Sequence, residues 1–339
     1  MAEQVASVAE PVAGFDDLVA ALRAVAEPTR LRLVALLSRA ELTVTEISQV
    51  VGQSQPRTSR HLRLLVDADI LERTPEGAFV FYRLADASPS ARLAHQLADL
   101  VPVADAAIAA DLVALERVRK ARAEAAAAYL SAHADELATV SALHVAEAEV
   151  ERAMLELIAG EGPIGRLLDI GTGTGRILEL LAPHSERSIG LDVDHDILVL
   201  ARAALSDAEL SQASVRQGDL RRPPFEAASF DVAVMHHVLH LLDDPGEAIA
   251  DAARLLRPGG RLLVVDFAAH ELEFLRTNHG HRSLGIADDD MSAWTTAAGL
   301  EIDGERSLQP PEDAGERLTV RLWLLRALPR GNGASAAVA

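Results

Sequence analysis

A glycine-rich turn between a predicted strand and a predicted helix is the first feature of this sequence that could do chemistry. Residues 166–170 read as a buried strand, with an acid at Asp169. Three glycines at alternate positions follow the strand: Gly171, Gly173 and Gly175. Glycine lets the backbone approach a ligand closely at such a turn. Arg176 stands where the dinucleotide fingerprint requires glycine or alanine, so the turn predicts a ligand site and disfavours a nicotinamide or flavin cofactor.

Two further acids end later predicted strands. Residues 188–192 end in Asp192, and residues 215–219 end in Asp219. An acid about 20 residues beyond a glycine turn of this kind is placed to accept ribose hydroxyls. A second acid can accept a hydrogen bond from an adenine amino group. The spacing therefore predicts recognition of a ligand that contains ribose and adenine.

Histidines follow the next two predicted strands, 230–235 and 261–267. The first group is His236, His237 and His240, and the second is His270, His279 and His281 with Glu273 and Arg276. Either group can supply a general base. The alternative is that these rings line a cleft without taking part in chemistry. No metal is expected, because the histidines and nearby acids follow no fixed ligand spacing.

Polar and basic residues gather on a predicted helix nearer the N terminus. A short helix begins near Thr43 and stops at Gly52, and the following helix has Pro56 in its first turn. The residues expected to contact DNA are Ser54, Gln55, Arg57, Thr58, Ser59, Arg60 and His61. Arginine can bind guanine, glutamine can bind adenine, and hydroxyls can bind phosphates. This order predicts a helix-turn-helix that reads the major groove.

Two predicted strands follow this helix, 71–74 and 78–84, joined by a turn at Pro75, Glu76 and Gly77. Arg73 and Arg83 are the positive residues of this hairpin, which we interpret as a β-wing able to touch the DNA backbone. The alternative is that the arginines of the preceding helix form only a solvated face. The neighbouring helix, turn and hairpin favour the DNA-binding interpretation.

The elements that must position these residues divide the chain into regions of different composition. The chain has 339 residues, enough for about two domains. The predicted fold class is α/β, with an N-terminal winged helix-turn-helix, a helical connector and a Rossmann-like domain with a mostly parallel sheet. The predicted boundaries are 1–13 for a disordered N-terminus, 14–100 for DNA binding, 101–160 for an Ala-rich helical linker, 161–329 for the ligand-binding domain and 330–339 for a disordered tail.

Charge and cysteine content exclude several classes of protein. The net charge is −19, but residues 1–100 hold 10 arginines against 13 acids and contribute only −3 of it. The absence of cysteine excludes a disulfide framework, a thiolate nucleophile and thiolate metal sensing. No signal peptide and no membrane span is read from the sequence. We therefore expect a cytoplasmic protein with no membrane partner.

Residues 20–84 resemble the ArsR/SmtB family of winged-helix repressors. The stretch that carries the resemblance is ELTVTEISQVVGQSQPRTSRHLRLLVDADILERTPEGAFVFYRL. The resemblance implies a homodimer, paired through the first helix and the helix that starts near Ser88, and an inverted-repeat operator in double-stranded DNA. Metal-sensing members carry cysteines where this chain has Thr43 and Thr45, and hydroxyls do not replace thiolates on a soft metal. A pair formed by His95 and Asp99 is not expected to hold a metal either.

Residues 165–267 resemble the class I methyltransferases that bind S-adenosylmethionine, with a closing antiparallel strand pair at 299–306 and 318–325. The resemblance implies that the glycine turn holds the methionine end of the cofactor, with Asp169 near its amino group. It implies that Asp192 holds the ribose and Asp219 the adenine. The resulting cofactor set is Asp169, Gly171, Gly173, Gly175, Asp192, Asp219, Leu220 and His236. The catalytic candidates are His236, His237 and His240, and the lid or acceptor-side candidates are Tyr129, His133, His144, His270 and Arg276.

These features leave three functional hypotheses open. The first is a DNA-binding regulator, a homodimeric repressor whose C-terminal domain binds S-adenosylmethionine or S-adenosylhomocysteine as effector. The second is an active small-molecule methyltransferase with an attached DNA-binding domain. The third is a degenerate methyltransferase fold used as a dimer scaffold, which the intact glycine turn and its acids disfavour. The Asn/Asp-Pro-Pro-Tyr motif of enzymes that methylate DNA bases is absent, which argues against a DNA methylase.

Overall fold

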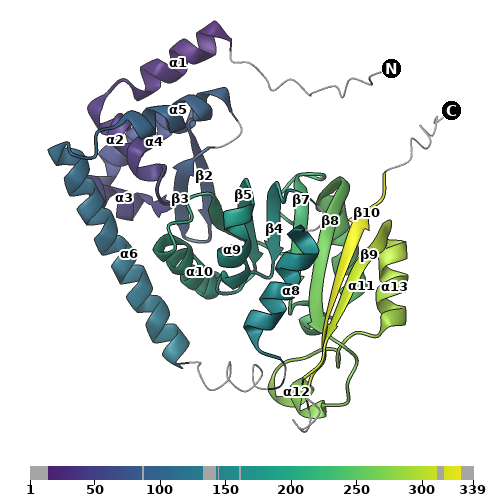
Figure 1. Ribbon diagram of the computed structural model, residues 1–339. Helices are drawn as coiled ribbons and strands as arrows, with labels where there is room; N and C mark the ends of the chain where they lie inside the picture. The colour runs from purple at the N-terminus through teal and green to yellow at the C-terminus, as the bar shows by residue number, and fades with distance from the viewer. Residues whose placement is uncertain are drawn as a thin grey trace, which may run out of the picture. The chain divides into compact units, whose positions relative to one another are not determined.

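The computed structural model describes residues 14–85, 88–132, 143, 145–159, 162–310 and 317–329 (Figure 1). The chain divides into two compact units, Met1–Ala121 and Arg122–Ala339. The expected linker 101–160 is shared between them, because helix α6 (Ala106–Ala132) crosses the boundary. The termini predicted to be disordered, 1–13 and 330–339, lie outside the described residues.

The first unit packs helices around a small antiparallel sheet. Its helices are α1 (Phe15–Val25), α2 (Pro28–Leu37), α3 (Val44–Val51), α4 (Gln55–Val66), α5 (Pro89–Leu100) and the first part of α6. Its strands, in the spatial order β1-β3-β2, are β1 (Leu42–Thr43), β2 (Leu71–Glu76) and β3 (Phe79–Leu84). Strands β2 and β3 form the predicted wing, and the core beneath α4 includes Leu33, Ile47, Leu62 and Leu65.

Local sequence signals fix the turn between α3 and α4. Thr43 Oγ1 accepts from the backbone N–H of Glu46, and Glu46 Oε2 accepts from the N–H of Thr43, which forms a capping box at the start of α3. Gly52 ends α3 at φ +67, a conformation that glycine adopts without strain. Pro56 lies in the first turn of α4. The predicted helix-turn-helix is therefore confirmed.

The second unit is built on a seven-stranded sheet in the order β6-β5-β4-β7-β8-β10-β9. Strands β4 to β8 are parallel, and β10 is antiparallel to both of its neighbours. The strands are β4 (Arg166–Ile170), β5 (Arg187–Asp192), β6 (Ala213–Gln217), β7 (Phe230–His236), β8 (Leu256–Phe267), β9 (Leu300–Leu308) and β10 (Val320–Ala327). The Rossmann-like sheet and the closing antiparallel strands are confirmed.

Helices cover both faces of this sheet. They are α8 (Glu147–Ala159), α9 (Arg176–Leu181), η1 (Ala182–His184), α10 (His195–Asp207), η2 (Leu239–Leu241), α11 (Pro245–Leu255), α12 (Glu273–Asn278) and α13 (Asp288–Ala297). Successive strand residues point to opposite faces. Leu262 and Val264 accordingly pack in the core beneath α11 and α13, whereas Leu263 and Val265 pack in the core beneath α8.

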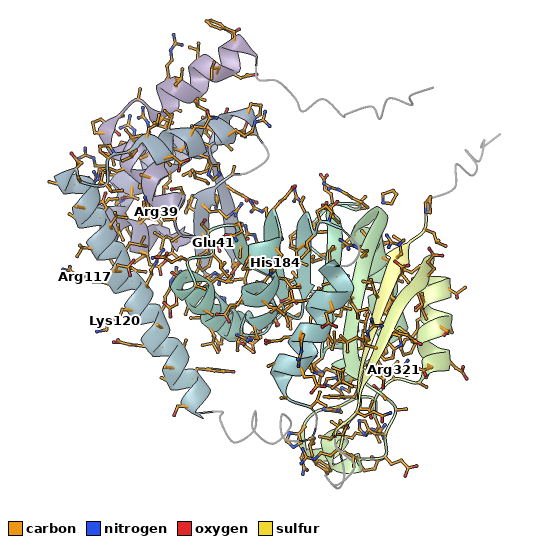
Figure 2. All side chains as sticks on the ribbon, viewed as in Figure 1. Arg39, Glu41, Arg117, Lys120, His184 and Arg321 are labelled. Carbon is orange, nitrogen blue, oxygen red and sulfur yellow. The ribbon has the colours of Figure 1, made fainter. Side chains whose placement is uncertain are left out.

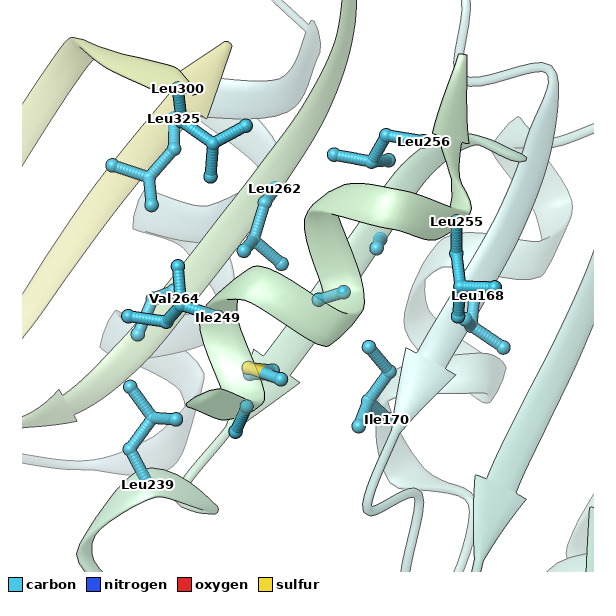
Figure 3. Close-up of a cluster of buried hydrophobic side chains, with 14 of the residues drawn as sticks. Leu168, Ile170, Leu239, Ile249, Leu255, Leu256, Leu262, Val264, Leu300 and Leu325 are labelled. Carbon is cyan, nitrogen blue, oxygen red and sulfur yellow. The ribbon is translucent and has the colours of Figure 1, made fainter. Parts of the chain in front are cut away.

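Figure 3 shows the core on the α11 side, where Ile249 lies near Leu262 and Val264 of β8 and Leu239 of η2. This continuous burial explains why the central strands read as unbroken apolar runs rather than alternating patterns. Within the part of the chain that the structure describes, no helix combines the length and apolar character required to span a membrane.

Candidate functional site

The order of the strands predicts a ligand crevice at the carboxyl end of β4. Strand β5 lies on one side of β4 and the later strand β7 lies on the other, so the chain winds in opposite directions from this point. Ligands of open parallel sheets bind at such reversal points, beyond the carboxyl ends of the strands. The glycine turn, Asp192 and the histidines after β7 all lie at these strand ends.

The glycine turn has the backbone that its sequence predicts. Gly171, Gly173 and Gly175 have φ values of +69, +52 and +86, where other residues are strained. The turn is anchored because the N–H groups of Gly171 and Thr172 both donate to the carbonyl oxygen of Leu191, at 2.7 and 3.1 Å. A Cβ on Gly171 would lie 2.5 Å from Val238 Cγ2, so this position requires glycine for space as well as conformation.

Asp192 ties the turn to the neighbouring strand. Its Oδ2 accepts from the N–H of Gly173 at 2.9 Å, and its Oδ1 accepts from the N–H of Asp194 at 3.0 Å. These bonds hold the carboxylate at the mouth of the crevice, and each oxygen keeps a second lone pair for a ligand hydroxyl. The residue that follows, Val193, is 63% exposed and offers an apolar surface beside this carboxylate.

Asp169 lies beneath the turn and is only 1% exposed. Thr172 Oγ1 donates to Asp169 Oδ2 at 2.6 Å. Burial raises the pKa of Asp169 to about 6, with Asp192 adding to the rise, while the hydroxyl of Thr172 and the charge of His236 act in the opposite direction. Asp169 therefore titrates near neutrality, and a cationic group in the crevice favours its ionised form.

Asp219 is exposed in the turn after β6, where its Oδ1 accepts from the N–H of Arg221 at 2.9 Å. Leu220 packs partly against the main core. The glycine turn, Asp192 and Asp219 thus lie at the ends of β4, β5 and β6, the three adjacent strands at one edge of the sheet. Contacts of these residues with a cofactor stay a prediction.

The two histidine groups of the sequence form one cluster around the ring of Phe267. His237 stacks on this ring at a centroid distance of 4.6 Å, and His240 lies 5.2 Å from it. His281 lies 4.2 Å from His240, with His270 6.5 Å beyond. Burial, together with neighbouring histidines, lowers the pKa of His281 to about 4 and also lowers the pKa of His270. Both rings are therefore neutral at physiological pH.

His240 is oriented by a buried carboxylate that the sequence analysis missed. The Nδ1 atom of His240 lies 2.7 Å from Asp266 Oδ1, and Asp266 has no exposed surface. Asp266 also accepts from the N–H groups of Leu239, His240 and Phe267. Because the carboxylate can only accept, this arrangement orients the ring of His240 with Nδ1 as the donor. Its Nε2 has no hydrogen-bond partner among the described residues.

Of the five lid or acceptor-side candidates, Tyr129 and Arg276 lie on helices, His270 belongs to the histidine cluster, and the other two cannot be placed. Tyr129 lies on the last part of α6 and packs near Leu200 and Ala203 of α10. Arg276 is exposed on α12, where it pairs with Glu273 at 3.3 Å. His133 and His144 lie outside the described residues. The lid roles of these residues stay predictions.

Most of the predicted DNA-reading residues lie on one exposed face of α4. Ser54, Gln55, Arg57 and Arg60 are exposed, and Ser59 and His61 are partly exposed. Arg63 is exposed one turn further along, and α4 contains no acidic residue. Gln55 Nε2 donates to Thr45 Oγ1 at 3.0 Å. This face is therefore positively charged along its whole length.

Two of the predicted DNA contacts are wrong. Thr58 is 0% exposed, because it shares the inner face of α4 with Leu62 and Leu65 at helical spacing. Arg83 is 5% exposed, because it lies on the same face of β3 as buried Phe81. Its Nε donates to Glu72 Oε2 on β2 at 3.0 Å, so the pair stabilises the wing instead of facing DNA.

Arg73 is exposed on β2 and is the remaining predicted wing contact. The residues missed by sequence reasoning are Thr172, Val193, Asp266, His281 as the partner of His240, and Glu147. A signal existed for Asp266, which stands near the end of a predicted strand as Asp169 and Asp192 do. No signal existed for Glu147, whose Oε1 lies 3.1 Å from His236 Nε2 across the fold.

Two family models match the chain. Residues 27–73 match a bacterial regulatory protein model of the arsR family, and residues 168–264 match a methyltransferase domain model. The first range covers the helix-turn-helix and the start of its wing. The second range covers most of β4, the strands β5 to β7 and most of β8. The chain therefore combines an ArsR-family helix-turn-helix with a methyltransferase domain.

Two curated relatives that are named as methyltransferases each match less than half of this chain. An uncharacterized methyltransferase, YcgJ, of Bacillus subtilis is 30% identical over 134 residues, which is 38% of this chain and 53% of the relative. A demethylmenaquinone methyltransferase of Tropheryma whipplei is 34% identical over 115 residues, covering 34% and 45%. The chain thus spans about half the length of these curated relatives.

Among solved structures, the N-methyltransferase NodS from Bradyrhizobium japonicum, in complex with S-adenosylhomocysteine, is 25% identical. The alignment covers 53% of this chain and 87% of that one, with a TM-score of 0.44.

Proposed function

We propose that this protein is a homodimeric DNA-binding repressor whose second unit binds S-adenosylmethionine or S-adenosylhomocysteine as its effector. The observation that carries the proposal is the bond from Gly173 N–H to Asp192 within a turn of three glycines at positive φ. This ligand turn stands in the same chain as an exposed arginine helix. A scaffold without a ligand would not need a turn in which a Cβ at Gly171 meets Val238.

The residue types predicted to line the crevice match the chemical groups of the cofactor. Asp192 would accept the ribose hydroxyls, Val193 would lie against the adenine, and Asp219 would accept from the adenine amino group. Asp169 would favour the ammonium of the methionine end electrostatically. When bound, S-adenosylmethionine supplies an electrophilic methyl group on a sulfonium. The residues of this chain bind and orient the ligand at the ends of β4, β5 and β6.

The DNA contact is assigned to α4 and Arg73. Arginines at 57, 60 and 63 follow one helix face, and acidic residues are absent from the helix. Local charge of this kind supplies phosphate contacts even where the whole chain is acidic. Gln55 and Arg57 lie in the first turn of α4, the part of a recognition helix that meets base edges.

Dimerisation is assigned to α1 and α5, which contact each other within the first unit. Phe15, Leu18 and Leu22 of α1 leave large apolar side chains exposed at helical spacing, and Leu100 is exposed at the end of α5. A contiguous apolar helix face on a monomer indicates a contact surface. Leu18→Glu is expected to convert the dimer to a monomer in light-scattering chromatography, and Val113→Glu, at an exposed valine of α6, is the matched control.

Fluorescence anisotropy on the DNA upstream of the gene tests the effector role directly. Affinity is measured at one fixed salt concentration without ligand, with S-adenosylmethionine and with S-adenosylhomocysteine, because phosphate contacts make affinity salt-dependent. Coupling of about 1–3 kcal/mol corresponds to a shift of about 5–150-fold. Asp192→Asn should remove the shift, whereas Asp207→Asn, an exposed acid at the end of α10, should keep it.

A tight DNA complex that neither ligand shifts contradicts the effector role. Calorimetry then shows whether the second unit binds the ligand at all. If S-adenosylhomocysteine binds without any effect on DNA affinity, the second unit acts independently of the first. If it does not bind at all, the assignment of the crevice fails.

The second candidate function is an active small-molecule methyltransferase with an attached DNA-binding domain. The pair of His240 and Asp266 favours it, because a histidine oriented by a buried carboxylate can take a proton from an acceptor. S-adenosylhomocysteine release is measured with a panel of hydroxyl and amine acceptors. A general base contributes roughly 10²–10⁴-fold, so His240→Gln should lower turnover by that amount while His184→Gln does not. Turnover that is unchanged in His240→Gln would remove this role.

A further inference from the structure

Three metal-ligating side chains from distant parts of the second unit converge beside the crevice. Glu147 is the first residue of α8, His236 is the last residue of β7, and His237 follows it. Glu147 Oε1 lies 3.1 Å from His236 Nε2. The three side chains can each offer one ligand atom such that all of these atoms lie within 4.8 Å of one another. Each residue is partly exposed, so the group is accessible.

The backbone at His237 is what brings the two rings together. Consecutive residues of a strand point to opposite faces of the sheet, which would separate His236 from His237. His237 instead has φ +56, and its ring lies 4.3 Å from that of His236, centroid to centroid. Such a conformation is strained for a non-glycine residue and persists only when surrounding contacts hold it.

Those contacts are present. The N–H of His237 donates to the carbonyl oxygen of Val265 at 2.8 Å, and its ring stacks on Phe267. Strained residues held in this way gather at ligand sites. The strain therefore adds an observation that does not depend on the spacing of the ligand atoms.

The neighbouring acid Asp266 does not serve as a ligand in the same way. Although Asp266, His237 and His240 also lie close together, both oxygens of Asp266 accept from backbone N–H groups or from His240. Its role is to orient His240. Glu147 lies on a helix end, 40% exposed, and its carboxylate can turn toward an ion.

We propose that Glu147, His236 and His237 form a site for one divalent transition-metal ion. Two imidazoles and one carboxylate suit zinc and its neighbours in the first transition row. Ligand atoms about 2.0–2.2 Å from zinc lie about 3.3–3.6 Å apart at tetrahedral angles. Glu147 Oε1 and His236 Nε2, which are 3.1 Å apart, need to separate only slightly to reach this spacing. Three protein ligands leave a coordination position for water or for an anionic oxygen of a ligand in the crevice. The proposal does not depend on the effector role.

Direct titration of the full chain with a metal salt tests the site. The protein is prepared without a histidine tag, treated with a chelator and titrated with ZnCl₂ by calorimetry. One ion per chain is the expected stoichiometry. With CoCl₂, a visible absorption band should appear that saturates at the same ratio, which reports nitrogen and oxygen ligation of the ion.

Single substitutions identify the ligands. Glu147→Gln and His236→Gln should weaken zinc binding by at least about 100-fold, since loss of a group that only orients a ligand already costs about 10–100-fold. His184→Gln is the matched control, because His184 is an exposed histidine at the end of η1 (Figure 2). Circular dichroism verifies that each variant is folded.

Two results would overturn the proposal. One is a wild-type chain that binds neither zinc nor cobalt, which would leave Glu147 and His236 as an ordinary ion pair. The other is zinc binding that survives both glutamine substitutions. S-adenosylhomocysteine binding, measured separately in a chelating buffer, reports on the crevice alone, so failure of the metal site is distinguishable from failure of the proposed function.

Discussion

The two units of this protein place their functional residues in opposite ways. In the first unit, the residues assigned to DNA, apart from Arg73 on β2, follow one another along a single exposed helix, α4. In the second unit, the residues assigned to a ligand come from the ends of several strands, and some are buried. A surface of the first kind depends on helical periodicity alone. A site of the second kind depends on strand order, backbone conformation and burial, so single substitutions there should have the larger consequences.

The largest effect is expected at the glycine turn. Gly171→Ala introduces a strained φ and a clash with Val238, each worth about 1–3 kcal/mol, so S-adenosylhomocysteine affinity should fall by roughly 100-fold or more in calorimetry. Gly259→Ala is the control, because Gly259 also has a positive φ, of +77, but a Cβ there meets nothing within 4 Å. Retained binding in Gly171→Ala would show that the ligand does not use this turn.

A smaller effect is expected on the exposed helix. Arg60→Ala removes one positive contact and should weaken DNA binding by about 1–2 kcal/mol, or about 5–30-fold, and reduce the salt slope by about one. Arg152→Ala, an equal change of charge on α8, should leave anisotropy titrations unchanged. Equal losses in both variants would mean that total charge, rather than the α4 face, determines affinity.

Ligand binding should also depend on pH through Asp169. Its pKa is raised to about 6 by burial, so the carboxylate is mostly ionised at pH 7 and mostly protonated at pH 5. The ligand ammonium favours the ionised form, and S-adenosylhomocysteine affinity should therefore fall about tenfold from pH 7 to pH 5. Calorimetry in a chelating buffer measures this. Asp169→Asn should bind more weakly at pH 7 and lose the pH dependence, and a variant with the same slope as the wild type would assign the slope to another group.

The same shift has a consequence for stability. The pKa of Asp169 lies near its ordinary value of 3.8 in the unfolded chain and rises to about 6 in the folded protein. Between these values the folded state binds more protons, so the contribution of this group to stability decreases as pH rises from about 4 to 6. His281 acts in the opposite direction, because its folded pKa of about 4 lies below the ordinary value of 6.5. Its contribution is lost as pH falls through that window.

The smallest effect is expected at Thr58. Its hydroxyl is buried and has no hydrogen-bond partner among the described residues. Thr58→Val should therefore change DNA affinity by less than about twofold and leave the free energy of unfolding unchanged or raise it by about 1 kcal/mol. Urea denaturation and anisotropy measure the two quantities. A large loss of DNA affinity without loss of stability would indicate that Thr58 contacts DNA.

Prediction from sequence succeeded where a pattern was local. The helix-turn-helix follows from Thr43, Gly52 and Pro56, each of which acts on its own turn of the chain. The mostly parallel sheet follows from alternating apolar runs and helical patterns. Errors arose where one helix or strand had to be divided into faces: residues 54–61 cannot all point outward at 100° per residue, and Thr58 and Arg83 were assigned to the wrong side.

The histidine cluster could not be predicted in the same way. His240 and His281 are close only because the loop after β8 returns over the end of β7, where the N–H groups of Arg282 and Ser283 donate to the carbonyl oxygen of His240. His236 meets Glu147 only because α8 packs on the sheet. Side chains that are far apart in the sequence but close in space produce no periodic pattern in the sequence.

The two kinds of domain, the glycine turn and the basic helix follow from local sequence, because each depends on residues within about one element of each other. The burial of individual side chains, the rise in the pKa of Asp169 and the contact between His240 and Asp266 arise only from the packing of distant elements. These properties depend on desolvation and on distances between elements. Desolvation and the distances between elements are set by the order of the strands in the sheet. The spacing of residues along the chain does not predict them.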